Sequence, residues 1–115
     1  MDDILELAKS IVELASDTLA ADIILLDVRD ITPFVDYYVL MTGETIPHMN
    51  ALERHIVREI RSKGYGRPLT EGSLQGEWVL INSGGITVHI LKKETRAFYQ
   101  LEKLWNKAPM LITVQ

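Results

Sequence analysis

Residues 77–108, EWVLINSGGITVHILKKETRAFYQLEKLWNKA, carry the strongest structural signals in this sequence. Residues 78–82 and 86–91 form two apolar runs rich in β-branched side chains, and Ser83-Gly84-Gly85 separates them. Glycine tolerates the positive φ angles that tight hairpin loops require. The stretch therefore predicts a β-hairpin that turns at Gly84-Gly85.

The apolar period changes after this hairpin from two residues to about 3.6. Ala97, Leu101 and Leu104 or Trp105 recur at helical spacing. A helix is therefore predicted from about residue 94, and Pro109 marks its end.

The chain before the hairpin predicts two helices and two strands, from the apolar periodicity and the capping residues. In order these are a helix capped by Asp2 or Asp3 and reaching about Leu19, strands at 21–28 and 36–42, and a helix from Thr45 to Gly64 with Pro47 in its first turn. Residues 65–76, with three glycines and a proline, predict the longest loop. Residues 109–115 predict an extended apolar tail.

These elements predict one α/β domain over residues 1–115. We expect a mixed β-sheet flanked by helices in the order α-β-β-α-β-β-α, packed in two or three layers. The helix between the two strand pairs can act as a crossover, which allows parallel pairing in part of the sheet.

The composition is that of an ordinary globular domain, with 115 residues of which 47% are hydrophobic and 24% charged. The absence of cysteine excludes disulfides, cysteine-ligated zinc and thiol catalysis. The first residues, MDDILELAK, are acidic where a secretory signal is basic, and no apolar run reaches the ~18 residues of a membrane span. We therefore expect a soluble protein, cytoplasmic or in an organellar matrix, without membrane contact.

The net charge of −4 is unevenly distributed along the chain. Residues 1–36 hold nine acidic and two basic residues, or −7, whereas residues 37–115 hold seven acidic and ten basic residues, or +3. An acidic chain is a poor general binder of nucleic acid, so basic protein partners are favoured. Arg54, Arg58 and Arg61 share one predicted helix face, which is either a solvated surface or a minor contact for RNA or phosphate.

The three histidines do not predict a metal site. His48 and His55 lie seven residues apart on one predicted helix, too far along its axis to share a metal without other ligands. His89 alternates with apolar neighbours on a predicted central strand, where a structural histidine is favoured over a catalytic base. We expect no metal and no cofactor.

Large aromatic and apolar side chains suggest a surface for a partner. Trp78 and Leu80 share one face of their predicted strand, and the preceding loop brings the acidic Glu71 beside them. Tyr99 and Trp105 are further amphipathic rings of the type enriched at protein interfaces. These five residues are the candidate partner-binding set.

Several motifs in this order resemble the ribosomal silencing factor family, RsfS or Iojap. They are ADIILLDV at 21–28, DYYVLMTG at 36–43, Glu71-Gly72 followed by WVLI at 78–81, VHI at 88–90, and RAFYQLEKLW at 96–105. The resemblance covers nearly the whole chain.

The resemblance implies a translation regulator that binds ribosomal protein fourteen of the large subunit and sterically blocks joining of the small subunit when nutrients are short. Minor contact with ribosomal RNA is a further expectation. Independently of the resemblance, the apolar side chains of Tyr99, Trp105 and residues 110–112 predict a homodimer. The family fold looks like a nucleotidyltransferase core that has lost its chemistry, because Gly43 is followed by Glu44 rather than serine and residues 49–55 hold no aspartate pair for two metals. We therefore expect no enzyme. The alternative is a divergent nucleotidyltransferase using Asp27, Asp36 and Glu44.

Overall fold

The computed structural model of the chain describes residues 3–73, 77–99, 103 and 106–115. Its elements follow the order α1 (Asp3–Asp17), β1 (Ala21–Asp27), β2 (Tyr37–Thr42), α2 (Ile46–Ser62), β3 (Leu69–Ser73), β4 (Trp78–Ser83), β5 (Ile86–Leu91), α3 (Lys93–Tyr99) and β6 (Met110–Val114).

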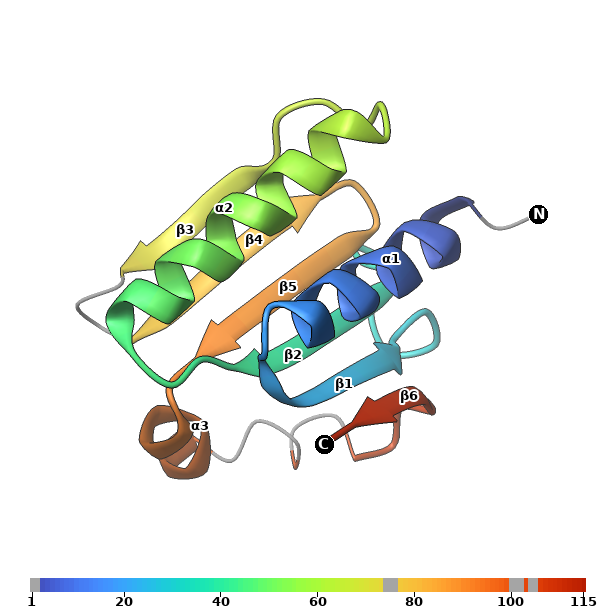
Figure 1. Cartoon of the computed structure of the whole chain (residues 1–115). Helices are drawn as coiled ribbons and strands as arrows, with labels where there is room; N and C mark the ends of the chain where they lie inside the picture. Colours follow the sequence, from blue (N-terminus) through green and yellow to red (C-terminus); the bar gives the residue numbers. More distant parts are fainter. Residues whose placement is uncertain (1–2, 74–76, 100–102, 104–105) are drawn as a thin grey trace.

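Six strands form one mixed sheet in the order β3-β4-β5-β2-β1-β6 (Figure 1). The pairing of β2 with β5 is parallel, and the other four pairings are antiparallel. The segment between these two parallel strands contains α2, as a parallel connection requires. The predicted single α/β domain with a mixed sheet and flanking helices is confirmed.

The two long helices cover the same face of the sheet (Figure 1). Each helix turns one apolar stripe towards the strands, and in α2 the buried stripe consists of Met49, Leu52, Ile56 and Ile60. These stripes and the inward side chains of the strands form the main hydrophobic core. The opposite face of the sheet is left free by α1 and α2.

The ends of α2 follow the capping signals of the sequence. The Oγ1 atom of Thr45 accepts a hydrogen bond from the backbone N–H of His48 at 3.1 Å, and Pro47 lies in the first turn, where a backbone donor is not needed. Gly64 has a φ of 89° just beyond the last turn. The predicted start and end of this helix are confirmed.

The predicted loop at residues 65–76 is partly wrong, because it contains the edge strand β3. Strand β3 pairs antiparallel with β4, and Gly72 lies opposite Val79. Gly72 has a φ of 86°, and a Cβ atom there would lie 2.4 Å from the carbonyl oxygen of Trp78. The glycine that suggests a loop is therefore required inside the strand pair.

The predicted order of elements is also incomplete at the carboxyl end. Residues 110–114, within the segment predicted as extended, form β6 and pair antiparallel with β1. The observed order therefore adds β3 and β6 to the predicted set.

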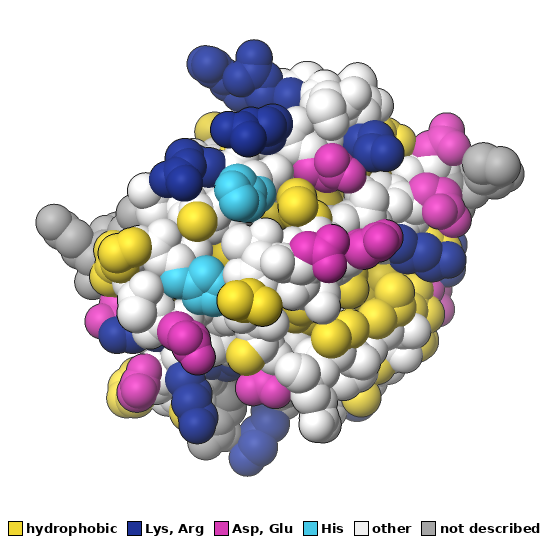
Figure 2. Space-filling view, viewed as in Figure 1, with side chains coloured by type: hydrophobic (Ala, Val, Ile, Leu, Met, Phe, Trp, Pro, Cys, Tyr) yellow, Lys and Arg dark blue, Asp and Glu magenta, His cyan; other side chains and the backbone are white. Residues whose placement is uncertain are grey.

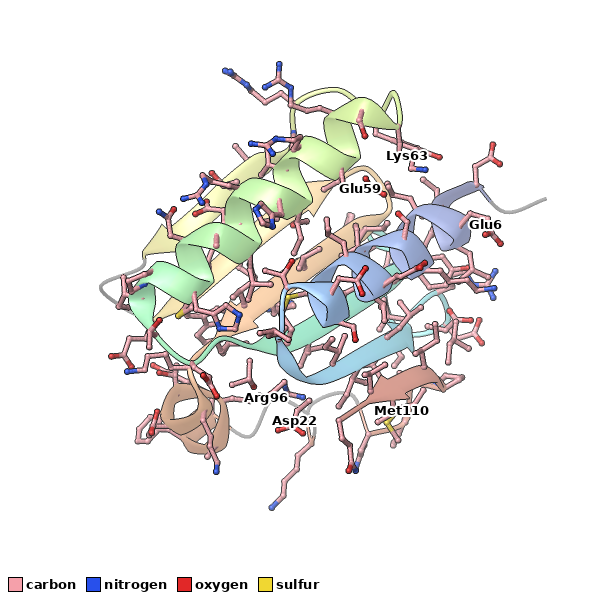
Figure 3. The ribbon with its side chains drawn as sticks, in the orientation of Figure 1. Glu6, Asp22, Glu59, Lys63, Arg96 and Met110 are labelled. Carbon is pink, nitrogen blue, oxygen red and sulfur yellow. The ribbon has the colours of Figure 1, made fainter. Side chains whose placement is uncertain are left out.

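The helix after the hairpin is present as α3, but its buried side differs from the prediction. Ala97 is exposed, whereas Arg96 is buried. The Arg96 Nη1 atom donates to the carbonyl oxygen of Asp22 at 2.7 Å and to the Oγ1 atom of Thr42 at 3.1 Å (Figure 3). Leu101, Leu104 and Trp105 lie outside the described residues.

Candidate docking surface

The sheet face opposite α1 and α2 carries the predicted partner-binding residues of β3 and β4. Along β4 the buried side chains Val79 and Ile81 belong to the main core, while Trp78 and Leu80 alternate with them and are only partly buried. Leu80 pairs with Glu71 on β3. The structure thus brings Glu71, Trp78 and Leu80 together on one face, as the alternation predicts.

Four aromatic rings form a connected cluster on this face, which we call the aromatic cluster: Tyr38, His89, Trp78 and Tyr99. The rings of Trp78 and Tyr99 have centroids 5.0 Å apart, and those of Tyr38 and His89 meet edge to face at 5.2 Å. Such tilted and edge-to-face pairs are the favoured aromatic geometries. The cluster therefore joins β2, β4, β5 and α3 into one continuous surface.

His89 is the buried centre of the aromatic cluster, with 6% of its surface exposed. The indole Nε1 of Trp78 donates to His89 Nδ1 at 3.4 Å, and because the indole nitrogen only donates, the ring proton of His89 lies on Nε2. Burial lowers the pKa of His89 from 6.5 to about 4. His89 is therefore neutral near pH 7 and holds the ring of Trp78 in place.

Helix α3 adds exposed rings to the edge of the cluster. Tyr99 is 52% exposed and Phe98 is 79% exposed, and their rings meet edge to face with centroids 5.0 Å apart. Strand alternation does not predict that Phe98, Tyr38 or His89 belongs to this surface, although the adjacent rings Phe98 and Tyr99 are a usable signal in the sequence. Trp105, the remaining predicted residue, lies outside the described residues.

An apolar pocket of about 300 Å³ opens on the same sheet face. Ile24, Leu26 and Leu40 line it from β1 and β2. Ala108, which precedes β6, and Met110, the first residue of β6, complete its apolar lining. Leu40 is the strand partner of His89, so the pocket continues the surface of the aromatic cluster.

The three acidic residues of the alternative nucleotidyltransferase site, Asp27, Asp36 and Glu44, do not lie together. Asp27 lies opposite Tyr37, next to Asp36, whereas Glu44 follows the other end of β2, about 20 Å away along the strand. Asp27 is bound by Arg29 through a hydrogen bond of 2.7 Å, and this contact lowers the pKa of the Asp27 carboxyl. Within the described part of the chain, no three histidine, aspartate or glutamate side chains are grouped as a metal site would require.

The two helical histidines have local structural contacts. His48 accepts from the backbone N–H of Glu44 through Nδ1 at 3.0 Å, and its Nε2 lies 2.7 Å from the carbonyl oxygen of Thr18. His55 Nδ1 lies 3.3 Å from the Oγ1 atom of Thr18. Both side chains therefore join α2 to the residue that follows α1.

The helices of the described part of the chain include none with the length and apolar character of a membrane span.

The fold and this surface define a class of protein: a small mixed α/β domain that presents an aromatic and apolar surface on the sheet face opposite its two long helices. The family model described as ribosomal silencing factor during starvation, RsfS, matches residues 1–115. The chain belongs to the ribosomal silencing factor family, which confirms the resemblance seen in the sequence.

Named relatives and a solved structure agree with this assignment. The ribosomal silencing factor RsfS of Bacillus subtilis is 34% identical over 106 residues, covering 89% of this chain and 90% of the relative. A mouse protein named mitochondrial assembly of ribosomal large subunit protein 1 is 30% identical over 92 residues, covering 76% of this chain and 40% of that protein. A crystal structure of a Chromobacterium violaceum protein superposes with a TM-score of 0.84 at 29% identity, covering 97% of this chain and 94% of the other.

Proposed function

We propose that this protein docks on ribosomal protein fourteen of the large ribosomal subunit and sterically blocks joining of the small subunit, repressing translation in the cytoplasm when nutrients are limited. The aromatic cluster, together with Glu71 and Leu80, is the proposed docking surface. The observation that carries the proposal is the contact between the partly buried Trp78 and the exposed Tyr99, on the sheet face opposite α1 and α2, in a member of the ribosomal silencing factor family.

The chemistry of the surface suits a basic ribosomal protein. Tyr and Trp side chains are enriched among the residues that contribute most to protein binding, because they bury large areas with little loss of conformational freedom. Glu71 is exposed beside them and supplies a negative charge for a basic partner. Contact with ribosomal RNA is the second, minor part of the proposed interface.

The test is co-sedimentation of the protein with purified large subunits. Trp78→Ala should weaken binding by about 2 kcal/mol, or roughly thirtyfold in Kd, because it removes the ring that contacts both His89 and Tyr99. Phe34→Ala is the matched control, since Phe34 is 85% exposed and lies outside the aromatic cluster. Unchanged pelleting by folded Trp78→Ala protein would reject this surface.

We also propose that free protein forms a homodimer through exposed apolar side chains of α3 and β6. Phe98 and Met110 are 79% and 64% exposed, and Leu111 is 43% exposed. Large exposed apolar side chains favour association in water. Analytical ultracentrifugation should show a mass that rises with concentration from monomer to dimer, and a monomer mass at all concentrations would refute the homodimer.

A further inference from the structure

Three arginines of α2 form a line that we call the arginine ridge: Arg54, Arg58 and Arg61. All three are exposed, and their spacing of four and three residues places them on one side of the helix, opposite the buried stripe. Figure 2 shows Lys and Arg side chains gathered over α2 on the face that α1 and α2 cover. The helical rise puts Arg54 and Arg61 about 10 Å apart along the axis.

The guanidinium groups of the ridge are not neutralised by neighbouring acids. Among the described residues no carboxylate lies within ion-pairing distance of any of them. Glu59, on the same helix, points towards α1 instead (Figure 3). The three arginines, with Val57 and Ser62, line a shallow surface hollow.

We propose that the arginine ridge binds the phosphate backbone of a structured ribosomal RNA element beside the docking site. This inference rests on the proposed function, because it assigns the RNA contact of the same docked protein to named residues. Guanidinium groups bind phosphate through paired hydrogen bonds, and a rigid line of three can engage successive phosphates. The ridge lies on the side of the sheet away from the aromatic cluster, and the shortest dimension of the molecule is 24 Å. An RNA element that contacts the ridge must therefore extend past the edge of the docked protein, from the subunit surface to the outer side of α2.

The net charge of −4 explains why the ridge acts only as a second contact. A free acidic protein is repelled by RNA at long range, so three arginines alone give weak association. Docking of the aromatic cluster holds the ridge near the subunit at a high effective concentration, and a weak contact then adds to the total affinity.

The salt dependence of binding to purified large subunits tests the ridge. The variant Arg54→Gln/Arg58→Gln/Arg61→Gln is compared with Lys9→Gln/Lys93→Gln/Lys107→Gln, which makes the same change in net charge at exposed positions elsewhere. Loss of three phosphate contacts should reduce the slope of log K against log salt by about 2, so wild-type affinity should fall about fifteenfold more than that of the ridge variant between 50 and 200 mM salt.

The outcomes separate this inference from the proposed function. Binding of the ridge variant to isolated ribosomal protein fourteen should equal that of the wild type. Equal salt slopes for the ridge and control variants on large subunits would overturn the arginine ridge and leave docking intact. Absence of saturable wild-type binding to large subunits would overturn both.

Photo-crosslinking identifies the chemical class of the partner. A benzophenone amino acid at Ser62, an exposed position next to the ridge, should give a nuclease-sensitive crosslink when the protein is bound to large subunits. A crosslink sensitive only to protease, whether to an acidic ribosomal protein or to a second copy of this chain, would overturn the RNA assignment.

Discussion

His89 shows how one residue fixes the geometry of the proposed docking surface. Its ring lies between Tyr38 and Trp78 and accepts the indole N–H of Trp78. Only the neutral imidazole offers an acceptor nitrogen, so protonation removes this contact. The orientation of Trp78 is therefore linked to the charge of a buried histidine.

Stability should fall in acid because of His89. The pKa of His89 is about 4 in the folded protein, compared with 6.5 for an ordinary histidine such as that of the unfolded chain. Between pH 6.5 and pH 4 the unfolded chain therefore binds more protons than the folded protein, and the free energy of unfolding falls as the pH is lowered. The loss reaches about 3 kcal/mol at pH 4. His89→Gln keeps an acceptor for Trp78 but does not titrate, so its urea unfolding should depend less on pH. Parallel pH profiles for the two proteins would contradict this role.

At the residue scale, strand alternation is enough to predict that Trp78 and Leu80 share a face. The contact between Trp78 and Tyr99 depends on how α3 folds back, which no local pattern encodes. Arg96 illustrates the limit, because its type and spacing predict an exposed side chain. It is buried because the carbonyl oxygen of Asp22, about seventy residues away in sequence, accepts its hydrogen bond.

At the scale of elements, predictability follows the range of the interactions. The hairpin of β4 and β5 is local, and its turn glycines and β-branched runs specify it. Strand β3, with the sequence LTEGS, has weak strand propensity and exists because it pairs with β4. Strand β6 likewise depends on β1, from the opposite part of the chain. The pairing of such strands therefore depends on the tertiary structure and is not encoded in a local pattern.

The attachment of α3 should depend on Arg96. Arg96→Met removes its hydrogen bonds to Asp22 and Thr42 and leaves their oxygens without this donor, at a cost of about 2–3 kcal/mol. We expect faster amide hydrogen exchange in α3 and weaker binding to large subunits, because α3 positions Tyr99 against Trp78. Lys93→Met, at an exposed position of the same helix, is the control and should change neither property. If the amides of α3 exchange at the wild-type rate in Arg96→Met, then α3 is held in place by other contacts.

At the scale of the whole molecule, the two helices on one face of the sheet separate two surfaces. The aromatic cluster lies on the sheet face opposite α1 and α2, and the arginine ridge lies on the outer side of α2. The sequence predicts that Trp78 and Leu80 share one surface and that the three arginines share another. It does not predict that these surfaces lie on opposite sides of the sheet, because that depends on which sheet face the helices cover. A protein with two such surfaces can contact two components of one subunit at the same time.

Inhibition of subunit joining should follow occupancy, because a steric block acts by mass action and is not consumed or recycled during joining. Light scattering of subunit association, measured as the protein is titrated against a fixed concentration of large subunits, should fall in proportion to bound protein and reach a plateau near one protein per subunit. Addition after the subunits have joined should have little effect, since the docking surface is then covered. Trp78→Ala should shift the titration to higher concentration without changing the plateau. Strong inhibition at a small fraction of one protein per subunit would require turnover, and the steric mechanism would then be wrong.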